Sequence, residues 1–372
     1  MTEEKKNKKI KEKCYDWFDE RFQVGDLLAF AAKKEVPDYR STYIYYFGGV
    51  ALFLFVVQVL TGFMLLLYYQ PGADSAYESV HYIVTQVKFG WLIRALHSWS
   101  ANLMVLFVFI HMFTVYFSLS FRKPREFTWL TGLGLLGLLM MFGFSGYLLP
   151  WNELAYFATR VGTGMAGAVP VIGDFILQVM RGGEEVTGAT ISRFFGLHVA
   201  VLPLVFGGLL AMHLFFIQKQ GMSEPVIWEQ KKMRKRYIKF VPNFMLRDFM
   251  MWLIVLDVLI LLAVFFPDGI GVVHWPLGVK ADAFAPPPAV IKPEWYFIFT
   301  FQFLKFLPAH IGPLEGELFG LIALNLGGML WGLVPFISSK PHEGKKRFVF
   351  QLFGILVLLF IIIMTILGYV LE

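Results

Sequence analysis

The chain has 372 residues, of which 57% are hydrophobic and 17% aromatic. Only 16% are charged, whereas soluble domains carry roughly 25%, so an ordinary soluble protein is excluded. The charges are clustered and leave several uncharged runs of about 20 residues, the length that crosses a bilayer as a helix. An all-α polytopic membrane protein is predicted, because the strands of a barrel would be about 10 residues long and would alternate in polarity.

Seven helices are predicted to span the membrane. They lie at 43–69, 94–119, 127–149, 194–217, 249–266, 317–337 and 348–371. Their orientation follows from lysine and arginine, which are enriched in cytoplasmic loops. Segments 1–40, 122–125, 219–247 and 340–347 fall on one side and hold 25 of the 33 Lys and Arg residues. We therefore expect a cytoplasmic N-terminus and an outer C-terminus, and we interpret the basic runs as membrane anchors with no nucleic-acid partner.

The distribution of charge and proline divides the chain into four parts. Residues 1–40 form a cytoplasmic tail with an amphipathic surface helix, and residues 41–218 form a four-helix bundle. Residues 219–247 are a basic cytoplasmic linker. Residues 248–372 form a three-helix part with a long outer loop, 267–316, and a loop of this length in a compact protein is usually functional.

Two of the predicted spans carry paired histidines. His97 and His111 are 14 residues apart in the second span, and His198 and His213 are 15 apart in the fourth. At about 100° per residue, each pair stays on one side of its helix, with about 21–22 Å between its members along the axis. If the two helices face each other, the four histidines form two pairs at two depths.

Two histidines that face each other across a dry gap suit a haem, whose iron takes one imidazole from each side. Zinc fits less well, because two histidines at one depth leave it short of ligands. The alternative is that each histidine only forms hydrogen bonds within the bundle. Four ionisable residues in two matched pairs favour haem, since such residues are costly in a bilayer and mark functional sites. The four histidines are therefore candidate iron ligands.

Glycines in the first and third spans repeat the spacing of the first histidine pair. Gly48 and Gly62 are 14 residues apart, and so are Gly132 and Gly146. A flat macrocycle between helices needs close approach of the backbone, which glycine permits. Packing of the helices alone is the alternative. Arg94, one turn before the first histidine, can reach a haem propionate on the outer side.

Two carboxylates stand in apolar surroundings. Glu294 lies in IKPEWYFIFTF (291–301), at the start of an apolar run. It is either a proton-accepting group at a boundary between water and lipid or the cap of a short helix. Asp257 lies within the fifth span, where it is protonated, pairs with a partner subunit or serves proton uptake.

These residues together resemble the cytochrome b subunit of Rieske–cytochrome b complexes, respiratory and photosynthetic. The resemblance covers nearly the whole chain. It rests on the two histidine pairs and on four stretches, namely YDWFDERF (15–22), GYLLPW (146–151), AVPVIG (168–173) and PEWY (293–296). PEWY alone is a weak signal, whereas PEWY after two correctly spaced histidine pairs is specific.

The chain combines features of two types of this family. The seven spans and the histidine spacings resemble the photosynthetic type, in which the chain is usually split in two; here the halves are fused. FVPNFMLRDF (240–249) resembles the respiratory type. In the photosynthetic type a cysteine at the start of the first span anchors an extra haem, but Tyr46 aligns with it here. Gln218 replaces an associated basic residue and the only cysteine, Cys14, lies elsewhere, so a third, covalent haem is not expected.

The resemblance implies roles for the residues around PEWY. Glu294 would accept a proton at an outer quinol-oxidation site, because desolvation raises the pKa of a carboxyl group toward the useful range. Tyr147 would line the same pocket. Pro293 would fix the turn, and Trp295 and Tyr296 would pack the start of the helix.

The resemblance also implies a bifurcated reaction. One electron of the quinol passes to a Rieske iron–sulfur protein and then to a c-type cytochrome subunit. The other crosses the membrane through an outer haem b (His97, His198) and an inner haem b (His111, His213) and reduces a quinone near Asp248. The expected protein is thus the catalytic subunit of a proton-translocating quinol–cytochrome c, or plastocyanin-like acceptor, oxidoreductase of a respiratory chain. Its complex is expected to be a homodimer in the lipid of a prokaryotic cytoplasmic membrane.

Two rival functions explain part of the sequence. A dihaem membrane anchor of another quinone-linked dehydrogenase or reductase also uses paired histidines, but it leaves PEWY and the long outer loop without a reason. A transporter explains seven spans and an intramembrane Asp257, but it does not explain the matched histidine spacing.

Overall fold

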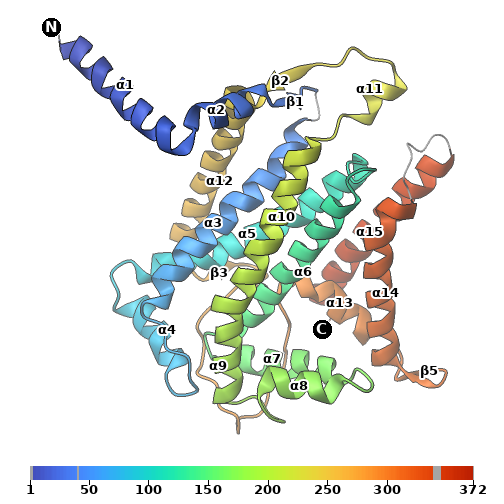
Figure 1. Ribbon diagram of the computed structural model, residues 1–372. Helices are drawn as coiled ribbons and strands as arrows, with labels where there is room; N and C mark the ends of the chain where they lie inside the picture. The colour runs from blue at the N-terminus through green and yellow to red at the C-terminus, as the bar shows by residue number, and fades with distance from the viewer. Residues whose placement is uncertain (1–2, 40–41, 338–344, 372) are drawn as a thin grey trace.

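The computed structural model describes residues 3–39, 42–337 and 345–371 (Figure 1). Within these ranges seven helices are long and apolar enough to cross a membrane, which confirms the predicted all-α polytopic fold. They are α3 (Tyr46–Leu66), α5 (Gly90–Phe117), α6 (Glu126–Leu148), α10 (Leu202–Gln220), α12 (Met245–Phe265), α14 (Gly316–Ile337) and α15 (Lys345–Val370). Each overlaps a predicted span, because a long apolar run satisfies its backbone hydrogen bonds in lipid as a helix.

Four of these helices form the central bundle. Helix α3 packs along α5, α6 packs along α10, and the four lie side by side in Figure 1. Helix α12 covers α3 and α5 on one flank, whereas α14 packs against α6 and α15 against α5. The core between α3, α5 and α12 is made of fully buried apolar side chains that include Leu54, Ala95 and Leu259.

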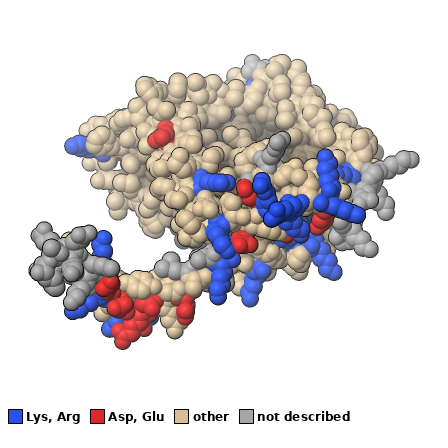
Figure 2. All heavy atoms as spheres, turned by 90° about the horizontal axis from the view of Figure 1, so that it is seen from above, with Lys and Arg blue, Asp and Glu red and all other residues tan. Residues whose placement is uncertain are grey.

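One end of the bundle carries the N-terminal segment and the linker at 219–247. Strand β1 (Glu35–Pro37) pairs with β2 (Tyr237–Lys239), with Val36 opposite Ile238, and so ties the N-terminal segment to the 219–247 linker. The linker also contains α11 (Val226–Gln230). Lys and Arg side chains gather on this end in the view from above (Figure 2), as the positive-inside prediction requires of a cytoplasmic face.

The opposite end is built from short helices and hairpins of the long loops (Figure 1). The helices are α4 (Ala76–Thr85), α7 (Glu153–Gly167), α8 (Gly173–Arg181), α9 (Gly188–Gly196) and α13 (Trp295–Lys305). The hairpins pair β3 (Gly269–Ile270) with β4 (Val273–His274) and β5 (His310–Ile311) with β6 (Leu314–Glu315). Most of the loop from 267 to 316 has no regular structure apart from these elements.

The N-terminal region is helical over a longer stretch than its aromatic spacing indicates. Helix α1 (Glu3–Phe22) includes the Lys-rich tail, and α2 (Val24–Lys33) follows after a break at Gln23, whose φ is 49°. Helix α1 projects away from the bundle (Figure 1), and its aromatic residues Trp17, Phe18 and Phe22 are at least half exposed. This exposure agrees with a helix that lies on the membrane surface.

The fourth span is not a regular helix. Helix α9 leads into a π-helical turn, η2 (Leu197–Val201), and α10 continues from it, so that the membrane-competent stretch runs from Gly188 to Gln220. Pro203 explains the irregularity, because it has no N–H group to donate to the preceding turn. Such π turns inside helices often occur at functional sites, and η2 contains His198.

Tyr116 joins the two halves of the chain. Its side chain is 1% exposed and stacks on Trp331 of α14 and Phe350 of α15, with ring centroids 4.4 and 5.2 Å away. Its hydroxyl donates to the carbonyl of Phe350 at 2.7 Å. The residue thus contacts both C-terminal helices from α5.

We predict that Tyr116→Ala costs about 3–5 kcal/mol of unfolding free energy, the range for truncation of a large buried aromatic residue. Tyr116→Phe keeps the stacked ring and loses one hydrogen bond, so it should cost about 1 kcal/mol. Thermal unfolding in detergent, followed by circular dichroism, measures both. Equal losses in the two variants would show that the stacking does not hold the halves together.

Candidate functional site

The four predicted iron ligands lie within the central bundle. His97 and His111 are on α5, His198 is in the π-helical turn η2, and His213 is on α10. Each imidazole of α5 lies close enough to one from the fourth span to sense its charge. The pairs that the structure brings together are His97 with His198 and His111 with His213, the pairing expected from the sequence.

A hydroxyl group faces the Nδ1 atom of His97. The Oγ1 atom of Thr61 lies 2.9 Å from that nitrogen, and the same hydroxyl donates its proton to the carbonyl of Val57 at 2.7 Å. A hydroxyl has a single proton, so Thr61 can only accept from the imidazole. This arrangement favours the Nδ1–H tautomer of His97, in which the Nε2 atom keeps a free lone pair.

Helix α6 repeats this arrangement for both histidines of the fourth span. Thr131 lies 2.9 Å from Nδ1 of His213, and Ser145 lies 2.9 Å from Nδ1 of His198. Each hydroxyl donates to the carbonyl four residues earlier on α6, at 2.8 Å. The arrangement thus favours an unprotonated Nε2 atom in three of the four imidazoles, as ligation of a metal requires.

Each of the four predicted glycines faces one of the histidines. A Cβ atom at the glycine position would lie between 2.8 and 3.4 Å from Cε1 of the facing ring. The pairs are Gly48 with His111, Gly62 with His97, Gly132 with His213 and Gly146 with His198. Glycine therefore lets each imidazole lie against the backbone of the neighbouring helix. The donor set fits a bis-His haem at each of two depths.

Arg94 is buried one turn before His97 and is held by the loop that follows α12. Its guanidinium donates to the carbonyl of Trp275 at 2.7 Å and to the carboxylate of Asp268 at 3.3 Å. Arginine has more N–H groups than these two bonds use. A contact with a propionate therefore stays open to it and remains a prediction.

Glu294 directly precedes α13, at its N-cap position. Its side chain makes no capping hydrogen bond, so capping does not explain the acid. Burial raises the pKa of Glu294 to about 7. The sequence predicts that Pro293, which comes just before it in non-regular chain, fixes this turn.

Three tyrosines from separate helices lie near Glu294. Tyr147 of α6, Tyr296 of α13 and Tyr369 of α15 all lie within range of its charge. The indole of Trp295 donates to the side chain of Asn102 on α5 at 2.8 Å and so fixes the start of α13 against the bundle. The structure thus brings Glu294, Tyr147 and Tyr296 together in one site. The sequence did not single out Tyr369, because it lies at the far end of the chain.

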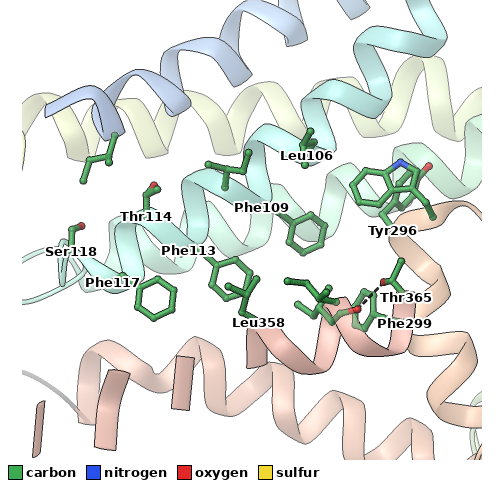
Figure 3. A pocket seen from close by; sticks show the side chains of 15 residues that line it. Leu106, Phe109, Phe113, Thr114, Phe117, Ser118, Tyr296, Phe299, Leu358 and Thr365 are labelled. Carbon is green, nitrogen blue, oxygen red and sulfur yellow. Dashed lines mark hydrogen bonds between the residues drawn. The ribbon is translucent and has the colours of Figure 1, made fainter. Parts of the chain in front are cut away.

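An apolar groove opens beside this site (Figure 3). Its volume is about 690 Å³, and it lies between α5, α13 and α15. It begins at Trp295 and Tyr296 and runs along α5 to Phe117 and Ser118. The few polar groups include Thr365, whose hydroxyl donates to the carbonyl of Ile361 within α15 at 2.7 Å. The groove therefore offers a long apolar chain a surface with few exposed hydrogen-bonding groups.

Asp248 lies at the same end of the bundle as the basic linker. It is in the first turn of α12 and faces Gly49 of α3, where a Cβ atom would lie 2.5 Å from Oδ1. Gly49 adjoins Gly48, which faces His111. Oδ1 of Asp248 is buried and has no hydrogen-bond partner among the described residues, which leaves it free for a ligand.

A cation missed by the sequence analysis stands at the same end of the bundle. The ammonium of Lys34 donates to the side-chain oxygen of Gln218 at 2.5 Å and lies 4.9 Å from the centroid of the Phe240 ring. Burial lowers the pKa of Lys34. Lys34, which comes from before the first span, thus brings a positive charge to Gln218, the position at which the resemblance implies a basic residue.

The fold and the site define a seven-span helical membrane protein with two facing histidine pairs inside a four-helix bundle. The model of the family Cytochrome b/b6/petB matches residues 33–221, and that of Cytochrome b(C-terminal)/b6/petD matches residues 280–371. The chain belongs to the cytochrome b family, whose members take part in electron transport.

Relatives show that both halves of the family are present in one chain. A cytochrome bc complex cytochrome b subunit of Chlorobaculum thiosulfatiphilum is 47% identical over 94% of this chain and 79% of its own length. Cytochrome b6 of Synechococcus sp. (strain JA-3-3Ab) is 44% identical over 58% of this chain and 99% of its own length. A solved structure titled hyperthermophilic respiratory Complex III aligns with a TM-score of 0.83 and 30% identity, over 95% of this chain and 91% of the other.

We predict that Gly146→Leu removes haem from the outer pair. A side chain at this position would meet the ring of His198, since even a Cβ would lie 2.8 Å from Cε1. Absorbance of the purified protein should fall by one haem per chain. Gly137→Leu is the matched control, because nothing lies within 4 Å of a Cβ at Gly137 on the same helix. Full haem content in Gly146→Leu would contradict the site.

Proposed function

We propose that the chain is the dihaem cytochrome b subunit of a cytochrome bc-type complex that oxidises quinol. The proposal depends on one observation: two pairs of histidines face each other in the bundle, and hydroxyl groups lie 2.9 Å from the Nδ1 atoms of three of them. A haem b at each set would supply one-electron redox chemistry. The chain orients the ligands and keeps water away from them.

At the outer end, Glu294 accepts a proton from a quinol. A pKa of about 7 suits a base that must take up and release protons near neutral pH. Tyr147 and Tyr296 line the site and limit the access of water. The apolar groove that starts at Tyr296 supports this assignment, because a quinol with an isoprenoid tail needs an apolar surface next to its head group.

At the other end of the bundle, Asp248 and Lys34 serve quinone reduction. The carboxyl group of Asp248, when it carries a proton, donates a hydrogen bond to a quinone carbonyl and delivers that proton as the ring is reduced. Lys34 supplies positive charge near Gln218, which stabilises a reduced, anionic quinone. Protons drawn from this side and released beside Glu294 yield net proton translocation across the membrane.

The partners that we propose follow from this reaction. The electron that leaves the outer site away from the haems needs a Rieske iron–sulfur protein and a c-type cytochrome as acceptors. Similarity to a cytochrome bc complex subunit and to a respiratory Complex III supports such an assembly. Asp257 is exposed on α12 and has no hydrogen bond or ion pair within the described part of the chain, which favours a contact with a partner helix. We place the complex, as a homodimer, in a prokaryotic cytoplasmic membrane with its basic face inward.

Haem content tests the proposal directly. We predict two b haems per chain by the pyridine haemochrome assay, both extracted by acid-acetone because no cysteine lies near either histidine pair. A haem that resists extraction would mean that Cys14 or another residue anchors a third one. Protein without any haem would overturn the proposal and favour a transporter.

The pH dependence of quinol oxidation tests Glu294. The base must be ionised to accept a proton, so the rate of cytochrome b reduction by quinol should rise with pH and level off above about 7. We predict that Glu294→Gln lowers the rate about 10²-fold or more and removes this rise. Stopped-flow reduction of the purified complex measures both effects. Glu315→Gln, an exposed carboxylate of the outer loop, should leave the profile unchanged, and an unchanged profile in Glu294→Gln would exclude the assigned role.

A further inference from the structure

The hydroxyl anchors of the histidines follow a sequence rule with one exception. Thr61, Thr131 and Ser145 each stand directly before the glycine that faces a histidine. Phe47 holds the equivalent position before Gly48, 14 residues before Thr61 on the same helix. The residue that would anchor the fourth histidine therefore has no oxygen.

The fourth histidine, His111, lacks an anchor in the structure as well. Its Nδ1 atom is buried and has no hydrogen-bond partner among the described residues. The nearby hydroxyl of Thr114 donates to the carbonyl of His111 at 2.8 Å and is thereby committed to the backbone. The ring of Phe47 instead lies 6.1 Å from that of Phe107, one turn before His111 on α5.

The two histidine pairs thus differ in the number of acceptors that face their Nδ1–H groups. Both outer ligands, His97 and His198, have a hydroxyl acceptor. Of the two inner ligands, His213 has such an acceptor and His111 does not. An acceptor on Nδ1–H draws the proton away from the ring and makes the imidazole a more basic ligand. A more basic ligand stabilises the ferric state and lowers the reduction potential of the iron.

We propose that the residue before each of these glycines sets the potential of the adjacent haem, and that Phe47, by leaving His111 without an acceptor, makes the inner haem the stronger electron acceptor of the two. The proposal rests on the proposed function, because it requires a haem at each histidine pair. Phe47 acts through His111 and is a positioning residue.

This asymmetry has the direction that the proposed electron path needs. An electron that moves from the outer to the inner end travels toward the negative side of an energised membrane, and the field opposes it. A higher potential at the inner pair offsets part of that opposition. A chain with four equal anchors would leave the two haems closer in potential.

The test is a redox titration of the complex, followed by the optical absorbance of each haem. Phe47→Thr places a hydroxyl opposite His111 and should lower the reduction potential of the inner haem. The expected change is about tenfold in the equilibrium constant for electron transfer between the haems, which is about 59 mV for one electron. Thr61→Val removes an acceptor from His97 and should raise the outer potential by a similar factor. Phe63→Thr is the matched control, since the same exchange on α3 occurs at an exposed side chain.

Haem content and the low-spin EPR signals are recorded first, so that a misfolded variant is recognised. If Phe47→Thr loses haem, Thr131→Val decides, because it removes the remaining inner acceptor and should raise the inner potential. Unchanged potentials and EPR signals in variants that retain both haems would overturn the inference and leave the proposed function intact. Absence of haem from the unaltered protein would instead overturn the proposed function itself.

Discussion

The close approach of each imidazole to the backbone of a neighbouring helix is the constraint on which the bundle depends. A Cβ at any of the four facing glycines would lie within 3.4 Å of a histidine ring, so a larger residue would push the helices apart or turn the ring. At three of the four glycines the preceding residue also brings a hydroxyl to the ring's Nδ1 atom. Two consecutive residues thus act on each of these three ligands, and the 14-residue spacing of the glycines on α3 and on α6 separates the two sites.

The π-helical turn reconciles two histidine spacings that differ by one residue. Fourteen steps on a regular helix end about 40° short of full turns, whereas fifteen end about 60° past them. A π turn takes up one extra residue, so the fifteen steps from His198 to His213 cover about the rotation of the fourteen from His97 to His111. Pro203, which cannot donate to the preceding turn, favours this local widening. The two histidines of each pair can then face each other across one flat haem at their own depth.

The features that could be predicted from the sequence are those that depend on long apolar runs or on regular spacings. The seven spans, the four histidines and their facing glycines all follow from runs and spacings within single segments. The break at Gln23, the widened turn at His198 and the place of Lys34 beside Gln218 could not be predicted in this way. Each depends on a local conformation or on a contact between segments far apart in the chain. The Thr–Gly and Ser–Gly pairs are present in the sequence, but that their hydroxyl groups contact the histidines follows only from the distance between each hydroxyl and Nδ1.

The acids at the two ends illustrate why burial, and not residue type alone, determines their chemistry. Glu294 stands at the N-cap of α13, where a carboxylate would ordinarily accept backbone N–H bonds and hold its proton weakly. Here the side chain makes no such bond and is buried, so desolvation dominates and raises the pKa of Glu294 to about 7. Asp248, at the other end of the bundle, is also an acid that the protein leaves without a partner, because its buried Oδ1 atom has no hydrogen bond among the described residues.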